Sequence, residues 1–252
     1  MAGGLSRWLL IGNSRWHWAE RAGAGLRVWH RSASEQARLA PMTPSEWPLA
    51  WAATGMLPAS LQLPAERRVE LAAVPLAGMP PWLGVDRALA GWEAWRRFAV
   101  PVLVADAGTV LSLTRVDATG SFAGGRLLAG MDLQLRAMAA GTAALPELGR
   151  GSGRPDACGA WPADTAAAMR SGVCRGLAAA VAEAAREVAS ERSSTRLVLT
   201  GGDAAELAPL VEAGLRRCER SDGEPPGIGV ELLENLCLEA LVRLAPELRQ
   251  VG

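Results

Sequence analysis

One plan of strands occurs twice in the chain, once near its start and once near its middle. An apolar strand, a turn of small polar residues, a second strand and a third follow one another over residues 8–30, and the order returns over residues 101–128. Only two copies are visible, which favours duplicated halves over a short-period solenoid. We therefore expect two halves, 1–98 and 99–252, with a cleft between them.

Runs of apolar residues, and the turn residues that separate them, predict the helices and strands of each half. Strands are expected at 8–11, 15–19, 26–30, 49–54, 69–74, 101–105, 110–116, 122–128 and 196–199, with an antiparallel beginning to the first sheet. Helices are expected at 86–98, at 164–190 with Asp164 as N-cap, after residue 203, and at 230–244.

The composition of the 252 residues excludes several classes of function. The 26 basic residues are all Arg and are balanced by 26 acidic residues, which argues against nucleic acid or an anionic membrane as partner. Without Lys, the chain cannot build a Walker A loop, a protein-kinase site or a Schiff-base enzyme. Half of the residues are apolar, so a sizeable core is possible.

Cysteine spacing and the apolar runs indicate a reduced, cytoplasmic protein without a membrane segment. The four cysteines are too far apart for a CxxC metal site, and we expect them to be thiols. The first residues lack the layout of a signal peptide, and the longest uncharged run, 71–85, is broken by three prolines.

Three turns of small residues follow three expected buried strands, at 12–14, 106–109 and 200–202. Glycine permits a close approach of the backbone, and hydroxyl groups add donors, so each turn could bind a phosphate group. Each could equally be an ordinary turn.

Seven short motifs, taken in order over about residues 8–215, resemble those of the type III pantothenate kinase family. They are Gly12-Asn13-Ser14, Gly84-Val85-Asp86-Arg87, Asp106-x-Gly108-Thr109, Gly124-Gly125-x4-Gly130, Thr142-Ala-Ala-Leu-Pro146, Thr165-x-x-Ala-Met-x-x-Gly172 and Leu199-Thr-Gly-Gly-Asp203. The resemblance implies an α/β fold of two ribonuclease-H-like, actin-like ATPase halves, with mixed sheets flanked by helices. It also implies transfer of the ATP γ-phosphoryl group to the primary hydroxyl of pantothenate, the first step of coenzyme A synthesis.

The resemblance also assigns the partners and the site. It implies a homodimer that uses ATP with Mg²⁺ and a monovalent cation, K⁺ or NH₄⁺. Asp86 matches the catalytic base, and a carboxylate there could accept the proton of the substrate hydroxyl. The substrate residues are Gly84, Val85, Asp86, Arg87 and Thr165; the nucleotide residues are Leu10, Ile11, Gly12, Asn13, Ser14, Arg15, Trp16, His17 and Thr109; and the cation ligand is Asp106.

Plainer interpretations of the same residues stay open. Asp86 could be a helix N-cap, Arg87 a solvated helix residue and Thr165 part of a first helical turn. Asp106 could bond its own turn. His17 and His30, expected on separate strands among tryptophans, indicate packing and are not spaced as metal ligands.

Two departures from the family pattern bear on activity. Leu10 stands where family members place an Asp that helps to hold magnesium, and Ala88 replaces an aromatic residue that Trp82 or Trp92 could supply. The alternative hypothesis is a catalytically weakened member acting as a regulatory or accessory binding protein. A third is another phosphotransferase or phosphohydrolase on the same fold, such as a sugar kinase or exopolyphosphatase.

Overall fold

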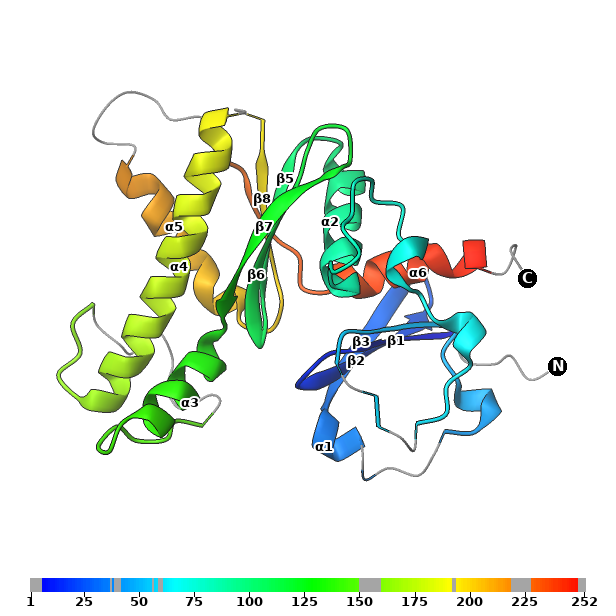
Figure 1. Cartoon of the computed structure of the whole chain (residues 1–252), viewed down its shortest axis with the longest axis horizontal. Coiled ribbons are helices and arrows are strands. Elements are labelled where there is room, and N and C mark those ends of the chain that lie inside the picture. The colour runs from blue at the N-terminus through cyan, green and yellow to red at the C-terminus, as the bar shows by residue number, and fades with distance from the viewer. Residues whose placement is uncertain are drawn as a thin grey trace. The chain divides into compact units, whose positions relative to one another are not determined.

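Contacts within the chain divide it into two units. Unit 1 comprises Met1–Arg97 and Asn235–Gly252, and unit 2 comprises Phe98–Glu234. The computed structural model describes residues 6–36, 38, 42–55, 57, 58, 61–149, 160–191, 194–218 and 228–248, whose elements are labelled in Figure 1.

Unit 1 contains a four-stranded mixed sheet of order β3-β2-β1-β4. β1 is antiparallel to β2 and parallel to β4, and β2 is antiparallel to β3. Leu9, Ile11, Trp16, Trp18 and Trp51 form an apolar cluster on this sheet, which explains the alternation of tryptophans along β2. The strands are β1 (Arg7–Ile11), β2 (Arg15–Ala22), β3 (Gly25–Ser32) and β4 (Ala50–Ala53).

The helices of unit 1 come from distant parts of the sequence. They are α1 (Ala33–Gln36), the short 3-10 helices η1 (Pro44–Glu46), η2 (Ala65–Arg67) and η3 (Leu71–Ala73), α2 (Val85–Phe98, whose last residue is assigned to unit 2), and α6 (Leu236–Leu248). α6 contacts β1, β2 and β4 and buries Leu236, Leu238, Leu241 and Leu244 almost completely. The C-terminal segment therefore completes the core of the N-terminal unit.

Unit 2 contains a five-stranded mixed sheet of order β7-β6-β5-β8-β9. β5 to β7 are antiparallel neighbours, whereas β8 and β9 add in parallel on the other side of β5. The strands are β5 (Val102–Ala107), β6 (Val110–Val116), β7 (Phe122–Ala129), β8 (Arg196–Thr200) and β9 (Val230–Leu232), and the helices are α3 (Met131–Gly141), α4 (Thr165–Glu191) and α5 (Ala204–Cys218). α4 and α5 lie side by side (Figure 1) and contribute to one apolar cluster with the sheet.

The repeated strand plan is confirmed in the two sheets. In each, the first three strands are antiparallel neighbours and the fourth adds in parallel beside the first, so β3-β2-β1-β4 corresponds to β7-β6-β5-β8. The expected long helix is also confirmed, and Asp164 caps it by accepting a hydrogen bond from the Ala167 amide (2.9 Å).

Two expected elements are wrong. The strand expected at 69–74 makes one ladder-like bond, from the Val69 amide to the Trp51 carbonyl, and then tightens into η3 as the Ala73 amide bonds to the Glu70 carbonyl. The helix expected at 230–244 begins only at Leu236, because residues 230–232 pair with the edge of β8 as β9. Tertiary pairing there overrides the helical periodicity.

The two units differ from the expected halves 1–98 and 99–252 in the assignment of one helix, α6. α6 belongs to unit 1 although it follows unit 2 in the sequence, since its apolar face packs on the first sheet. No helix among the described residues combines the length and apolar character needed to cross a membrane.

Candidate active site

The first glycine turn, which follows β1, is held by a second glycine from the end of β4. The amides of Thr54 and Gly55 donate to the Ile11 carbonyl (2.9 and 3.4 Å), and the Gly12 amide donates to the Arg15 carbonyl (2.9 Å). A Cβ on Gly55 would lie 2.8 Å from the Gly12 carbonyl oxygen, so only glycine permits this approach. Gly55 was not among the residues expected at the site, although a glycine directly after the expected strand at 49–54 was its signal in the sequence.

The segment 10–17 is expected to bind the nucleotide, but only some of its side chains are exposed to solvent. Ile11 and Trp16 are buried in the core, so they can offer only backbone groups. Asn13 is exposed, whereas Gly12, Ser14, Arg15 and His17 are half-buried. Leu10 is 8% exposed, pairs in register with His17 on β2 and Ala52 on β4, and carries no charge into the turn.

His17 and His30 share a hydrogen bond across β2 and β3. Their Nδ1 atoms are 2.9 Å apart and the residues are direct register partners. Burial, with smaller effects of His30 and Arg15, lowers the pKa of His17 to about 4. The two histidines, expected only to pack, thus form a polar pair that their separation in the sequence concealed.

Gly84 and Asp86 form a tight unit at the start of α2. The Asp86 Oδ1 atom accepts a hydrogen bond from the Arg87 amide (2.8 Å), as a carboxylate at a helix N-terminus does. A Cβ on Gly84 would lie 2.6 Å from the same oxygen, which explains why glycine precedes the carboxylate by two residues. Val85 and Arg87 are 9% and 8% exposed, so this end of α2 is anchored in unit 1.

The electrostatics of this unit suit proton chemistry. Loss of solvent around the carboxyl group raises the pKa of Asp86, although the Arg87 amide and guanidinium favour the charged form. Burial also lowers the pKa of Arg87, against the opposing effect of Asp86. A raised carboxyl pKa beside a buried cation is a common feature of catalytic sites. The plainer interpretation of Asp86 as an N-cap is wrong, because α2 begins at Val85 and Asp86 lies within its first turn.

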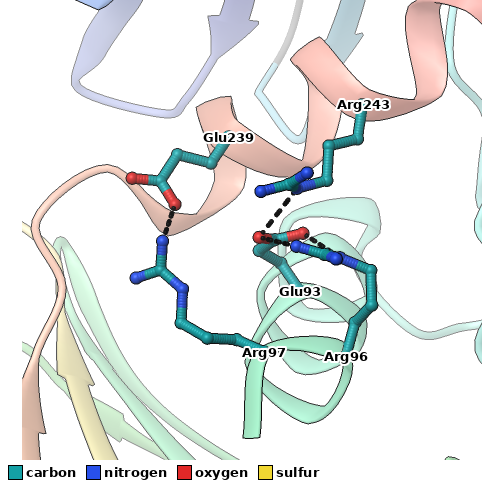
Figure 2. Close-up of polar contacts among 5 residues, drawn as sticks. All are labelled: Glu93, Arg96, Arg97, Glu239 and Arg243. Carbon is teal, nitrogen blue, oxygen red and sulfur yellow. Dashed lines mark hydrogen bonds and ion pairs between the residues drawn. The ribbon is translucent and has the colours of Figure 1, made fainter. Parts of the chain in front are cut away.

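α2 is clamped to α6 by buried charge (Figure 2). The Glu93 side chain is fully buried, accepts two hydrogen bonds from Arg96 (2.9 and 3.0 Å) and accepts another from Arg243 on α6 (3.0 Å). Arg97 pairs with Glu239 of α6 at 2.8 Å. At the other end of α2, the Cys237 thiol donates to the Asp86 carbonyl (3.4 Å). α6 therefore supports the helix that carries Asp86, a contact that no local sequence pattern indicates.

In unit 2, three loops meet around Asp106 at the end of β5. A Cβ on Gly201, which has φ +91°, would lie 2.4 Å from the Asp106 Oδ1 atom and 2.7 Å from the Ala107 carbonyl oxygen. A Cβ on Gly130 would clash with the carbonyl oxygens of Gly108 and Thr109 at 2.1 and 2.6 Å. The Asp106–Thr109 turn is thus enclosed by backbone, and the turns at 106–109 and 200–202 lie close together.

The remaining expected residues differ in their exposure to solvent. Thr165 is exposed in the first turn of α4, and nearby Trp161 is 94% exposed. Trp92 is only 9% exposed, whereas Trp82, two residues before Gly84, is 71% exposed, so of these two only Trp82 is accessible to a ligand.

The acidic residues of the described ranges do not build a magnesium site by themselves. No group of three or more His, Cys, Asp and Glu side chains converges there, and Leu10 offers no oxygen ligand. By contrast, the turns at 12–14 and 106–109 contain glycine and hydroxyl groups, the features by which a turn can bind a phosphate group. The side chains of Cys174 and Cys237 form no disulfide bond, as expected, whereas Cys158 and the side chain of Cys218 lie outside the described part of the chain.

Comparison with known proteins agrees with the motifs. Residues 63–187 match the family model described as type III pantothenate kinase. The chain is 38% identical over 212 residues to the type III pantothenate kinase of Synechococcus sp. (strain JA-3-3Ab), covering 83% of this chain and 85% of that protein. It is 38% identical over 218 residues to that of Synechococcus elongatus, covering 81% and 86%.

The fold has relatives among solved structures. A ROK family glucokinase from Streptomyces griseus, solved in complex with glucose and AMPPNP, has a TM-score of 0.52 at 16% identity, with 98% of this chain and 100% of that chain covered. This likeness shows the two-lobed α/β fold of actin-like kinases and nothing of the substrate. Identity and coverage against the curated relatives show that the chain belongs to the type III pantothenate kinase family.

Proposed function

We propose that the chain phosphorylates pantothenate. The γ-phosphoryl group of ATP passes to the primary hydroxyl of pantothenate and yields 4′-phosphopantothenate, the first step of coenzyme A biosynthesis. Membership of the family supports the substrates. The observation that carries the assignment in this chain is the half-buried Asp86 carboxyl group, seated against Gly84 and beside the buried Arg87 at the start of α2.

Asp86 is the proposed catalytic base. Its carboxylate orients the hydroxyl of pantothenate and accepts its proton late in a loose phosphoryl-transfer transition state. Gly84, Val85, Arg87 and Thr165 are the proposed substrate residues; the Arg87 guanidinium suits the carboxylate of pantothenate. Val85 can contribute only backbone groups, since its side chain is buried.

The two glycine turns are the proposed phosphate sites. Residues 10–17 and Thr109 bind ATP, with donors of the Gly12–Ser14 turn other than the Gly12 amide, which is bonded to the Arg15 carbonyl. Asp106 binds a monovalent cation, K⁺ or NH₄⁺, a proposal that rests on the likeness to the family. Magnesium would be held mainly by the phosphates of ATP and by water, because the described residues offer no carboxylate cluster for it.

We also propose a homodimer that acts in the cytoplasm. Both proposals rest on the likeness to the family. Sedimentation of the purified chain tests the first.

A weakened, accessory role is the second candidate. It is favoured by one observation, the buried Leu10 at the position of the family's carboxylate. An assay of ADP release with ATP, magnesium and pantothenate separates the two candidates. Release that depends on pantothenate and on K⁺ or NH₄⁺ supports the kinase, whereas a folded protein that releases none, and gains release in Leu10→Asp, supports the weakened member.

A further inference from the structure

The peptide group between Asp86 and Arg87 is held by hydrogen bonds at both of its ends. Its N–H group, on Arg87, donates to the Asp86 Oδ1 atom at 2.8 Å. Its C=O group, on Asp86, accepts a hydrogen bond from the Cys237 thiol of α6 at 3.4 Å. A peptide group is planar, so a bond that fixes the direction of the carbonyl also fixes the direction of the N–H. The thiol therefore acts on the carboxylate through one rigid plane.

The Asp86 carbonyl can accept the thiol in addition to its helical hydrogen bond. In an α-helix this carbonyl accepts the amide of the residue four positions later, here Ala90, and its oxygen has a second lone pair for another donor. Ala90 and Cys237 are 1% and 8% exposed, so water has little access to replace the thiol. Removal of the thiol would therefore take away a donor that solvent does not readily restore.

Cys237 is held in place by the packing of α6. It is the second residue of that helix, and its neighbours Leu236 and Leu238 are 0% and 1% exposed. Farther along α6, the Arg243 guanidinium bonds to the buried Glu93 of α2 (Figure 2). The thiol thus comes from a helix that the core and a buried ion pair fix within unit 1.

We propose that Cys237 is a positioning residue for phosphoryl transfer. Its thiol orients the Asp86–Arg87 peptide group, whose N–H then aims the Asp86 carboxylate at the acceptor hydroxyl. The inference rests on the proposed role of Asp86 as the base, and it assigns Cys237 no contact with a substrate. A side chain that only filled space would act through its volume, whereas a positioning thiol acts through its hydrogen bond.

Paired substitutions of Cys237 separate the hydrogen bond from the volume of the side chain. Cys237→Ala removes the donor, whereas Cys237→Ser differs from it by a hydroxyl group that can donate to the same carbonyl. With ATP, magnesium, potassium and pantothenate, Cys237→Ala should lower kcat by about three- to tenfold, as loss of one weak hydrogen bond predicts, and leave the KM for ATP unchanged. Cys237→Ser should recover most of the wild-type kcat.

Cys174→Ala is the matched control. Cys174 is the other buried thiol of the described residues, and it donates to Glu206 of unit 2 at 3.1 Å. Its substitution also removes a buried sulfur atom and should leave kcat unchanged. Circular dichroism establishes that each variant is folded. If Cys237→Ala does not fold, Cys237→Val, which keeps the buried volume without a donor, replaces it.

A spectroscopic readout tests the contact without any substrate. Asp86-Arg87 is the only Asp-Arg pair in the sequence, so labelling of Asp carbonyls with ¹³C and of Arg amides with ¹⁵N selects the NMR signal of this one peptide group. A donor at the carbonyl polarises the group and strengthens its N–H as a donor, which moves the proton resonance downfield. The resonance should lie upfield of its wild-type position in Cys237→Ala and return toward it in Cys237→Ser.

The inference is overturned if Cys237→Ala keeps the wild-type kcat, if Cys237→Ser is as slow as Cys237→Ala, or if the Arg87 amide resonance is the same in all three proteins. The two readouts also separate this inference from the proposed function. Wild-type protein that releases no ADP with pantothenate would reject the proposed function, while the resonance still decides whether the thiol orients the peptide group. Equal release by wild type and Cys237→Ala would reject the positioning role alone.

Discussion

Gly84 lies against the Asp86 carboxylate, so a substitution there should disturb the proposed base. In Gly84→Ala the added methyl group would meet the Asp86 Oδ1 atom at 2.6 Å and displace it. A misplaced catalytic group costs on the order of 100-fold in rate, so kcat/KM should fall by about that factor. Steady-state kinetics measure the loss.

Gly176→Ala is the matched control for that substitution. Gly176 lies in α4 with nothing within 4 Å of an added Cβ, so activity should be unchanged and the free energy of unfolding should rise by about 0.5–1 kcal/mol. If Gly84→Ala and wild type have the same kcat/KM, the added methyl group does not displace the Asp86 carboxylate and the argument for Gly84 is wrong.

Asp86 is expected to lower the stability of the folded protein, although it is needed for activity. Its raised pKa means that folding disfavours the ionised carboxylate, so wild-type stability is diminished at pH values above the folded-state pKa. Asp86→Asn should therefore unfold at higher urea concentration than wild type at pH 7.5. The difference in the urea concentration of unfolding between the two proteins should narrow as the pH is lowered, because the wild-type carboxyl group becomes protonated. An Asn variant less stable than wild type at pH 7.5 would contradict this.

At the scale of elements, the buried Glu93 couples α2 to α6. Arg243→Ala should lower the free energy of unfolding by about 1–3 kcal/mol, because Glu93 keeps its charge inside the unit with one partner fewer. In the double variant with Glu93→Gln the loss should be less than the sum of the single losses. Urea unfolding of the four proteins measures this coupling.

The ion pair between Arg97 and Glu239 joins the same two helices but is more exposed, so it serves as the control for the buried Glu93. Arg97 and Glu239 are about one-third exposed, so Glu239→Ala should cost less than about 1 kcal/mol. Two results would show that the ion pairs of Glu93 contribute little to the packing of α2 on α6. One is additive losses of unfolding free energy for Glu93→Gln and Arg243→Ala, and the other is a loss for Glu239→Ala as large as that for Arg243→Ala.

At the scale of the whole molecule, removal of residues 235–252 should unfold unit 1 selectively. Four leucines of α6 lie in the core of that unit, and exposing each fully costs about 1.5–3 kcal/mol. Amide hydrogen exchange of the truncated chain should show lost protection in β1 to β4 with protection retained in β5 to β8. Protected strands in unit 1 would contradict this packing.

Much of the molecule could be predicted from sequence because its strands alternate and its turns contain glycine. The strands at 8–11 and 101–105, the long helix after Asp164 and the repeated plan all follow from local patterns. The bond between His17 and His30, the approach of Gly55 to Gly12 and the packing of α6 in unit 1 depend on tertiary contacts. The start of β9 was mistaken for helix for the same reason, since pairing with β8 decides it.

The central claim is that Asp86 carries proton acceptance in the phosphorylation of pantothenate. The most direct measurement is pantothenate-dependent release of ADP by wild-type protein and by folded Asp86→Asn, each with ATP, magnesium and potassium. We predict release by wild type and a fall in kcat of about 10²–10⁴-fold in the variant, with ATP binding retained. Undiminished release by Asp86→Asn, or none by folded wild-type protein, would contradict the claim.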